Sequence, residues 1–148
     1  MDVSNLPFNT WVGLSVDGDD VVLLPEAPHL NHLGSVHATV IFAAAEAATG
    51  QLLFRRFPDL VDTCDVVLRS CDVKYRRPAM PGAVIRGQAW LSDEELDSFQ
   101  KSLTKRGRAI VEIRVRVVQD DVEVCTGRCT WFAATRSAAN ESSDGASG

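Results

Sequence analysis

The sequence lacks several features that would place it in a well-marked class of protein. No apolar run approaches the roughly 20 residues that a membrane-spanning helix needs. The first five residues lack the basic region and apolar core of a secretory signal. Positive charge is also scarce: 15 Lys and Arg against 20 Asp and Glu give a net charge of −5. Because phosphate binding needs a concentrated positive surface, nucleic acid is a poor candidate partner. We therefore expect a cytoplasmic protein that binds neither nucleic acid nor a membrane.

The cysteines and histidines show no spacing typical of a metal site. The four cysteines, Cys64, Cys71, Cys125 and Cys129, form no Cys-x-x-Cys pair. In a reducing cytoplasm we expect them to be free thiols, most of them buried. The three histidines, His29, His32 and His37, lie close together in a loop rich in Pro, Asn and Gly, but they match no catalytic zinc motif. The sequence thus predicts no bound metal.

The length of 148 residues fits one domain with a proper core. We expect a loosely structured lead-in at residues 1–10, a folded domain at 11–135 and a flexible tail at 136–148, where Ser, Ala, Asn and Gly dominate. Apolar alternation and turn residues predict strands within 11–16, 21–24, 65–75, 83–91, 111–117 and 122–133. Ser92 and Glu95 form a capping box that predicts a short helix ending at Gly107.

The most informative stretch is a predicted helix at about residues 37–54. Its alanines and larger apolar residues cover nearly every face, which is typical of a buried helix. It carries one carboxylate, Glu46, with no Lys or Arg three or four residues away. A carboxylate is rarely buried without a partner, so Glu46 either faces a pocket or is paired by another segment. The order of elements predicts an α+β fold in which an antiparallel sheet curls around this helix, or a second subunit covers what the sheet leaves open.

Two motifs then support a family resemblance. Asn31, Gly34 and His37 follow the pattern Asn-x-x-Gly-x-x-His, and Glu46 stands nine residues after His37. Residues 73–79 form a second landmark, an apolar residue followed by x-Tyr-x-x-Pro-Ala. With this layout, the chain resembles the hotdog fold and, within it, the PaaI-like acyl-CoA thioesterases. The resemblance implies hydrolysis of an acyl-CoA to free acid and CoA, no cofactor beyond the CoA of the substrate, and a homodimer or a homotetramer built from two dimers.

The chain departs from the family pattern in two places. The family has two glycines after the His, where this chain has Ala38 and Thr39. Ala38 keeps the backbone N–H that the family uses to hold the thioester oxygen. Many relatives also have a Ser or Thr on the next strand to orient water, and that position falls on Leu68. Ser70, two residues along, is expected on the same strand face and could substitute.

The resemblance and the chemistry together assign the candidate catalytic residues. An apolar helix raises the pKa of Glu46 toward the range of a general base, and Glu46 could also be a nucleophile; the alternative is a structural Glu. The N–H of Ala38, at a helix start, could stabilise an oxyanion. Asn31 could bind the thioester oxygen or a water, or could be an ordinary turn residue. His37 could be catalytic or could cap the helix.

Four further residues are candidate substrate-binding residues. Gly34 belongs to the motif loop, and Ser70 lies on the strand that follows the helix. Arg76 and Arg77 end that strand, where they could bind the phosphates of CoA or simply be solvated surface residues.

The spacing along the helix also predicts how the site is assembled. Ala38 and Glu46 are separated by about 12 Å along the helix axis and about 80° around it, so both cannot contact one carbonyl. Two antiparallel helices across a two-fold axis could bring Ala38 of one subunit near Glu46 of the other. The sequence thus favours a thioesterase with a site shared across a homodimer. A non-catalytic protein that binds acyl-CoA or another acyl ligand is the main alternative, and an acyl-thioester dehydratase ranks last.

Overall fold

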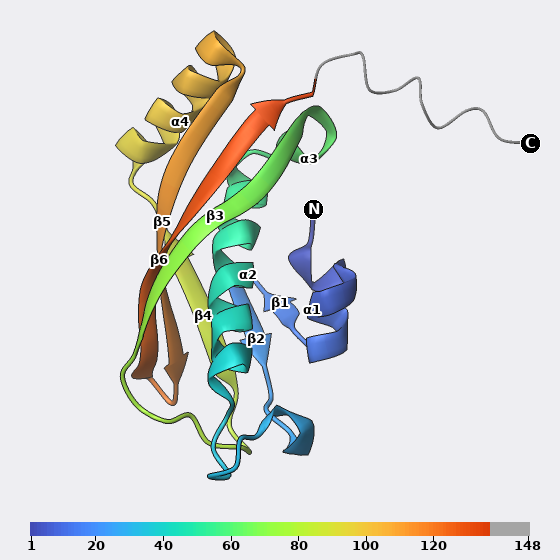
Figure 1. Cartoon of the computed structure of the whole chain (residues 1–148), viewed down its shortest axis with the longest axis vertical. Coiled ribbons are helices and arrows are strands. Elements are labelled where there is room, and N and C mark those ends of the chain that lie inside the picture. The colour runs from blue at the N-terminus through green and yellow to red at the C-terminus, as the bar shows by residue number, and fades with distance from the viewer. Residues whose placement is uncertain (137–148) are drawn as a thin grey trace, which may run out of the picture.

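The computed structural model describes residues 1–136, in which a six-stranded antiparallel sheet curls around one long helix (Figure 1). The strands, in their order across the sheet, are β1 (Ser15–Asp17), β2 (Asp20–Leu23), β4 (Ile85–Trp90), β5 (Arg108–Gln119), β6 (Val122–Thr135) and β3 (Cys64–Tyr75). The helices are α1 (Pro7–Val12), α2 (Ala38–Arg56), α3 (Leu60–Thr63) and α4 (Asp93–Arg106), with short 3-10 turns η1 (Val3–Asn5) and η2 (Ala27–His29). The predicted α+β layout is confirmed. Of the predicted tail, residues 137–148 lie outside the described residues.

The central helix α2 packs unusually close to the sheet because small residues line the contact. Ala44 and Ala48 are fully buried, and Gly87 of β4 lies beneath them. A Cβ added at Gly87 would lie 2.6 Å from the backbone oxygen of Ala44. The helix and the strand therefore meet nearly backbone to backbone. Only glycine at position 87 allows this approach, because any other residue would place a Cβ in the contact. This contact fixes the depth at which α2 lies in the curled sheet.

The predicted second helix is confirmed, together with its capping box. The Ser92 hydroxyl accepts a hydrogen bond from the Glu95 N–H at 3.2 Å, and the Glu95 carboxylate accepts one from the Ser92 N–H at 2.7 Å. The helix α4 ends at Gly107, whose φ of +65° is the left-handed conformation of a helix C-cap. Its buried Phe99 packs against Phe57, with ring centroids 5.0 Å apart, and closes one end of the core.

The N-terminal prediction is wrong in its local structure. Residues 7–12 form helix α1 instead of a lead-in followed by a strand from Trp11. Pro7 stands at the first turn and Gly13, with φ of +83°, ends the helix. Nor is the segment loose, because Val3 is buried and its N–H donates to the side chain of Gln51 on α2 at 3.1 Å. The segment therefore anchors on the C-terminal half of α2.

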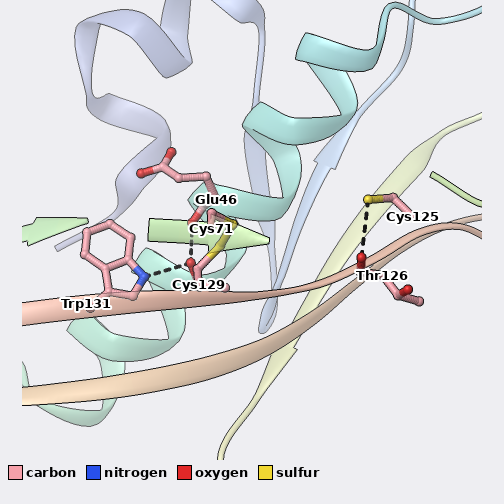
Figure 2. Close-up of a disulfide and its surroundings, with 7 residues drawn as sticks. Glu46, Cys71, Cys125, Thr126, Cys129 and Trp131 are labelled. Atoms are coloured by element: carbon pink, nitrogen blue, oxygen red, sulfur yellow. Dashed lines mark hydrogen bonds between the residues drawn. A yellow bond between two sulfur atoms is a disulfide. The ribbon is translucent and has the colours of Figure 1, made fainter. Parts of the chain in front are cut away.

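The expectation of four free thiols is wrong for two of them. Cys71 and Cys129 lie directly opposite each other on β3 and β6, with Cα atoms 4.1 Å apart, and form a disulfide (Figure 2). Facing residues of an antiparallel pair come this close only in the correct strand register, which residue spacing does not reveal. Cys64 and Cys125 are free and buried. Burial raises the pKa of the Cys125 thiol to about 11, so this thiol stays protonated at neutral pH.

Two absences apply to the described part of the chain. Within residues 1–136, no helix is both long and apolar enough to cross a membrane. In the same residues, no group of three or more His, Cys, Asp or Glu side chains is arranged to hold a metal ion.

Candidate active site

The loop before α2 is shaped by Asn31. Its side-chain oxygen accepts hydrogen bonds from the N–H groups of Leu33 at 2.9 Å and Ser35 at 3.3 Å, and its amide nitrogen donates to the Ser35 hydroxyl at 2.9 Å. Gly34 supplies the left-handed residue of this turn, with φ of +76°. Asn31 therefore holds the loop against the start of α2, and one hydrogen of its amide remains for another acceptor.

The first turn of α2 presents an unpaired donor. His37 is the N-cap, and its Nδ1 accepts a hydrogen bond from the N–H of Thr39 at 3.1 Å. The N–H of Ala38 points out of the first turn, and within residues 1–136 no group accepts from it. The Tyr75 hydroxyl donates to the backbone oxygen of Ala38 at 3.1 Å, which ties the end of β3 to the helix start. Tyr75 marked the second sequence landmark, yet sequence reasoning assigned it no role.

A pocket of about 310 Å³ opens at this point between the helix start and the end of β3. Its wall includes Asn31, Ser35 and Ala38 on one side and Tyr75, Arg76 and Arg77 on the other. Four of the predicted site residues, Asn31, Ala38, Arg76 and Arg77, are thus brought together. His37 and Gly34 belong to the same loop but do not line the pocket, and Glu46 lies two turns further along α2.

The Glu46 side chain is half-buried and extends from α2 away from strand β6 (Figure 2). Within the described residues its carboxylate has neither a salt bridge nor a hydrogen bond, so the partner that the sequence left open is not provided by this chain's residues 1–136. Burial raises the pKa of this carboxyl group because desolvation disfavours its charged form. An unpaired carboxylate with a raised pKa is a stronger proton acceptor than an ordinary surface carboxylate.

A buried hydrogen-bond relay holds the backbone of Glu46 against the sheet. Trp131 of β6 donates from its indole N–H to the hydroxyl of Thr49 at 2.9 Å. That hydroxyl donates to the backbone oxygen of Glu46 at 2.7 Å (Figure 2). The turn of α2 that carries the carboxylate is therefore fixed to the same strand that carries Cys129. Sequence reasoning missed this relay because Trp131 and Thr49 lie 82 residues apart in the chain.

The predicted placement of Ser70 is wrong. A β-bulge lies between Leu68 and Ser70: Leu68 pairs with Trp131, whereas Ser70 pairs with the adjacent residue Thr130. The extra residue, Arg69, reverses the alternation, so Ser70 lies on the outer face of the sheet and not on the face of Leu68. The residue after Ser70, Cys71, faces α2 instead and packs in the core with Leu68. Ser70 therefore cannot orient a water molecule beside Glu46 of its own subunit.

Solved structures with the same architecture identify the fold as the hotdog fold, as predicted. A Pseudomonas aeruginosa protein, described as of unknown function and a probable thioesterase, is 20% identical with a TM-score of 0.76, and the alignment covers 90% of this chain and 91% of that one. The Bacillus halodurans protein BH2602, solved with CoA, is 21% identical with a TM-score of 0.65, over 85% of this chain and 74% of that one. A mutant of the phenylacetic acid degradation protein PaaI from Thermus thermophilus is 24% identical with a TM-score of 0.61, over 86% and 98%.

Sequence comparison gives the family. Residues 14–133 match the family described as "Domain of unknown function (DUF4442)". The chain belongs to this family. No curated protein is similar enough in sequence to match it.

Proposed function

We propose that this protein hydrolyses an acyl-CoA thioester to a free acid and CoA, at a site shared by two copies of the chain. The observation that carries the proposal is the unpaired, half-buried Glu46 with its raised pKa, on a helix whose first turn presents a free N–H beside a pocket. Thioester hydrolysis needs a base for water, a donor for the oxyanion and a pocket for the substrate. These groups supply all three.

In the proposed reaction, the Glu46 carboxylate takes a proton from a water molecule as the water oxygen attacks the thioester carbonyl carbon. The carbonyl oxygen becomes an oxyanion, which the N–H of Ala38 stabilises, helped by the positive end of the α2 dipole. When the tetrahedral intermediate collapses, the C–S bond breaks and the thiolate of CoA takes the proton from Glu46. The products are the carboxylic acid and CoA, and Glu46 is again a carboxylate.

The long edge strand β3 supports the homodimer. It lies at one edge of the sheet with 12 residues and pairs only with β6 among the described strands (Figure 1). An unpaired edge of this length can add a strand from another chain. Antiparallel pairing of β3 with its copy across a two-fold axis would also set the two α2 helices antiparallel. That arrangement is the one in which Ala38 of one copy approaches Glu46 of the other.

The relatives support the substrate class. One solved relative carries CoA, another is described as a probable thioesterase, and two are PaaI proteins of phenylacetic acid degradation. Arg76 and Arg77, in the wall of the pocket, provide positive charge for the phosphates of CoA.

The direct test is thiol release from a panel of short, long and aromatic acyl-CoAs, with the signal of the protein's own cysteines subtracted. Wild type should hydrolyse one class, and Glu46→Gln should lose most of that rate while keeping its circular dichroism spectrum. Glu94→Gln, which changes an exposed carboxylate of α4, is the matched control and should keep full activity. Activity that survives Glu46→Gln would refute Glu46 as the base.

A mixing experiment tests the shared site. Ala38→Pro removes only the N–H at the first helical position, where proline fits the helix and the extended His37 before it. Glu46→Gln and Ala38→Pro should each be inactive alone. In mixed dimers, one of the two sites combines the intact Ala38 with the intact Glu46, so refolding the two together should restore about a quarter of wild-type activity. No recovery, with mixed dimers demonstrated, would refute a site that combines Ala38 of one chain with Glu46 of the other.

A non-catalytic acyl-CoA-binding protein remains the second candidate, and the bulge in β3 favours it. On the face of β3 toward α2, the residues nearest the bulge are Leu68 and Cys71, and neither bears a hydroxyl that could orient water. Wild type that binds acyl-CoA but hydrolyses no member of the panel would establish this alternative.

A further inference from the structure

A second hollow, of about 580 Å³, lies on the outer face of the sheet, opposite to α2. Residues that point outward from four adjacent strands form one row across it: Asp72 of β3 pairs with Arg128 of β6, Arg128 with Arg114 of β5, and Arg114 with Trp90 of β4. We call this hollow the outer groove. Arg76 lines both the outer groove and the pocket beside Ala38. The two cavities are therefore adjacent around the end of β3, and one long ligand could occupy both.

The free positive charge of the outer groove is concentrated where it joins the pocket. Lys74 and Arg76 line the groove, and Arg77 lines the adjoining pocket. None of these three cations forms a salt bridge within residues 1–136. Arg76 is oriented by a hydrogen bond from its Nε to the hydroxyl of Thr126 at 3.1 Å. In a chain with a net charge of −5, such a cluster indicates a site for an anion and not a general surface property.

The rest of the groove is balanced in charge and offers an aromatic surface. Arg114 is bound by Glu95 at 2.6 Å, and Arg128 lies 3.4 Å from Glu112. Glu123 lines the groove nearer to Arg76, and its carboxylate lies 4.0 Å from Arg116. The carboxylate of Asp72 stands in the same row as Arg114 and Arg128, so this part of the groove is not a strong anion site. Trp90 lies there instead, with 43% of its surface exposed. An exposed indole beside an arginine can stack on the flat face of a nucleobase.

We propose that the outer groove binds the 3′-phosphorylated adenine nucleotide end of coenzyme A. The phosphates contact Lys74 and Arg76 near the pocket, and the adenine stacks on Trp90 at the other end. The proposal rests on the proposed function, because the pocket beside Ala38 then holds the thioester and the pantetheine arm. Binding of the nucleotide in the groove also selects the substrate class. The enzyme then acts on thioesters of free CoA and not on thioesters of a carrier protein, because the phosphopantetheine of a carrier protein has no adenosine to place in the groove.

The first test needs no turnover. Adenosine 3′,5′-bisphosphate is titrated calorimetrically into the full-length protein, with pyrophosphate as a second ligand that has phosphates but no base. The bisphosphate should bind, and Trp90→Leu should weaken it roughly tenfold, as expected for loss of one base–aromatic stack. Trp11→Leu, which removes the most exposed tryptophan from α1, is the matched control and should leave the affinity unchanged.

The charges are tested in the same way. Lys74→Gln should weaken the bisphosphate several-fold and reduce the salt dependence of binding. Arg108→Gln removes an exposed arginine elsewhere on β5 and should do neither. Pyrophosphate that binds as tightly as the bisphosphate and is equally insensitive to Trp90→Leu would overturn the nucleotide assignment, because the site would then recognise phosphate alone.

The second test compares kcat/KM for one acyl group carried by CoA and by pantetheine. Wild type should prefer the CoA thioester at least tenfold, and Trp90→Leu and Lys74→Gln should move the ratio toward one. Hydrolysis of both thioesters with equal kcat/KM, and no bisphosphate binding, would overturn the groove while the thioesterase stands. Bisphosphate binding that Trp90→Leu weakens, in a protein that hydrolyses neither thioester, would support the groove and refute the proposed hydrolysis.

Discussion

The relay from Trp131 through Thr49 to Glu46 predicts a measurable cost for Thr49→Val. Valine has nearly the same shape as threonine, so the change removes the hydroxyl and leaves the packing of this fully buried position intact. The indole N–H of Trp131 then loses the one acceptor that residues 1–136 provide, at a buried position. A buried donor left unpaired costs about 1–3 kcal/mol. The backbone oxygen of Glu46 also loses the Thr49 hydroxyl as a donor. This oxygen remains within helix α2, so the second loss adds little to the free-energy cost.

A double-mutant cycle isolates that cost. Trp131→Phe removes the N–H together with part of the ring, so it is destabilising through lost packing as well. In the Trp131→Phe background no indole donor remains to be left unpaired, and Thr49→Val should be close to neutral. The free energy of coupling between the two sites should therefore be about 1–3 kcal/mol, the whole cost of the unpaired donor. Urea unfolding followed by far-ultraviolet circular dichroism measures it without relying on the fluorescence that Trp131→Phe changes.

The control is Thr104→Val, which makes the same substitution at an exposed position of α4. It should change the free energy of unfolding by less than about 0.5 kcal/mol. The reasoning is refuted if Thr49→Val is as mild as this control, or if it costs the same with and without the indole N–H.

Three further predictions concern stability. Gly87→Ala should cost about 1–3 kcal/mol in urea unfolding, because its Cβ would lie 2.6 Å from the Ala44 backbone oxygen; an unchanged midpoint would contradict the close packing. Ser92→Ala should cost about 1 kcal/mol by removing the α4 cap, measured by thermal unfolding, and an unchanged melting temperature would argue against the cap. The third concerns pH: burial raises the folded-state pKa of Glu46, so its stabilising contribution is present below the ordinary pKa of 4.5 and is lost as pH rises through the raised value. Glu46→Gln should therefore be more stable than wild type at neutral pH, with an advantage that shrinks as the pH falls from the raised value to 4.5 and stays constant below it; the opposite trend in urea midpoints would show that the carboxylate is stabilised by a partner.

The elements that the sequence predicted well are those defined by local signals. The helix α4 follows from Ser92, Glu95 and Gly107, which act within one turn of its ends. Strand β5 alternates buried and exposed residues over nearly its whole length, as its apolar periodicity predicts. The buried character of α2 follows from its alanines, because no arrangement could expose all of its apolar faces. In each case neighbouring residues carry the information.

The helix α1 shows where competing local signals mislead. Trp11, Val12, Leu14 and Val16 favour a strand, and that interpretation outweighed Pro7 and Gly13, which mark the first turn and the cap of a helix. Tertiary packing decides between helix and strand for this segment. Val3 and Val12 are buried, whereas Trp11 is 81% exposed. This pattern fits a helix, because a strand that begins at Trp11 would be expected to bury that side chain. Short segments of this kind are resolved by what they pack against.

The candidate site depends on register, which residue counting does not supply. One extra residue, Arg69, moves Ser70 to the outer face and turns Cys71 inward, and the same register brings Cys71 opposite Cys129. Simple alternation placed Ser70 on the same strand face as Leu68, and the bulge between them puts the two residues on opposite faces. By contrast, Ala38, Arg76 and Arg77 meet at one pocket because each lies at the end of an element that local signals predict, and Asn31 joins them from the loop that precedes α2. Residues at the ends of well-predicted elements can therefore be assigned to a site from sequence, whereas residues within a strand can be assigned only when its pairing is known.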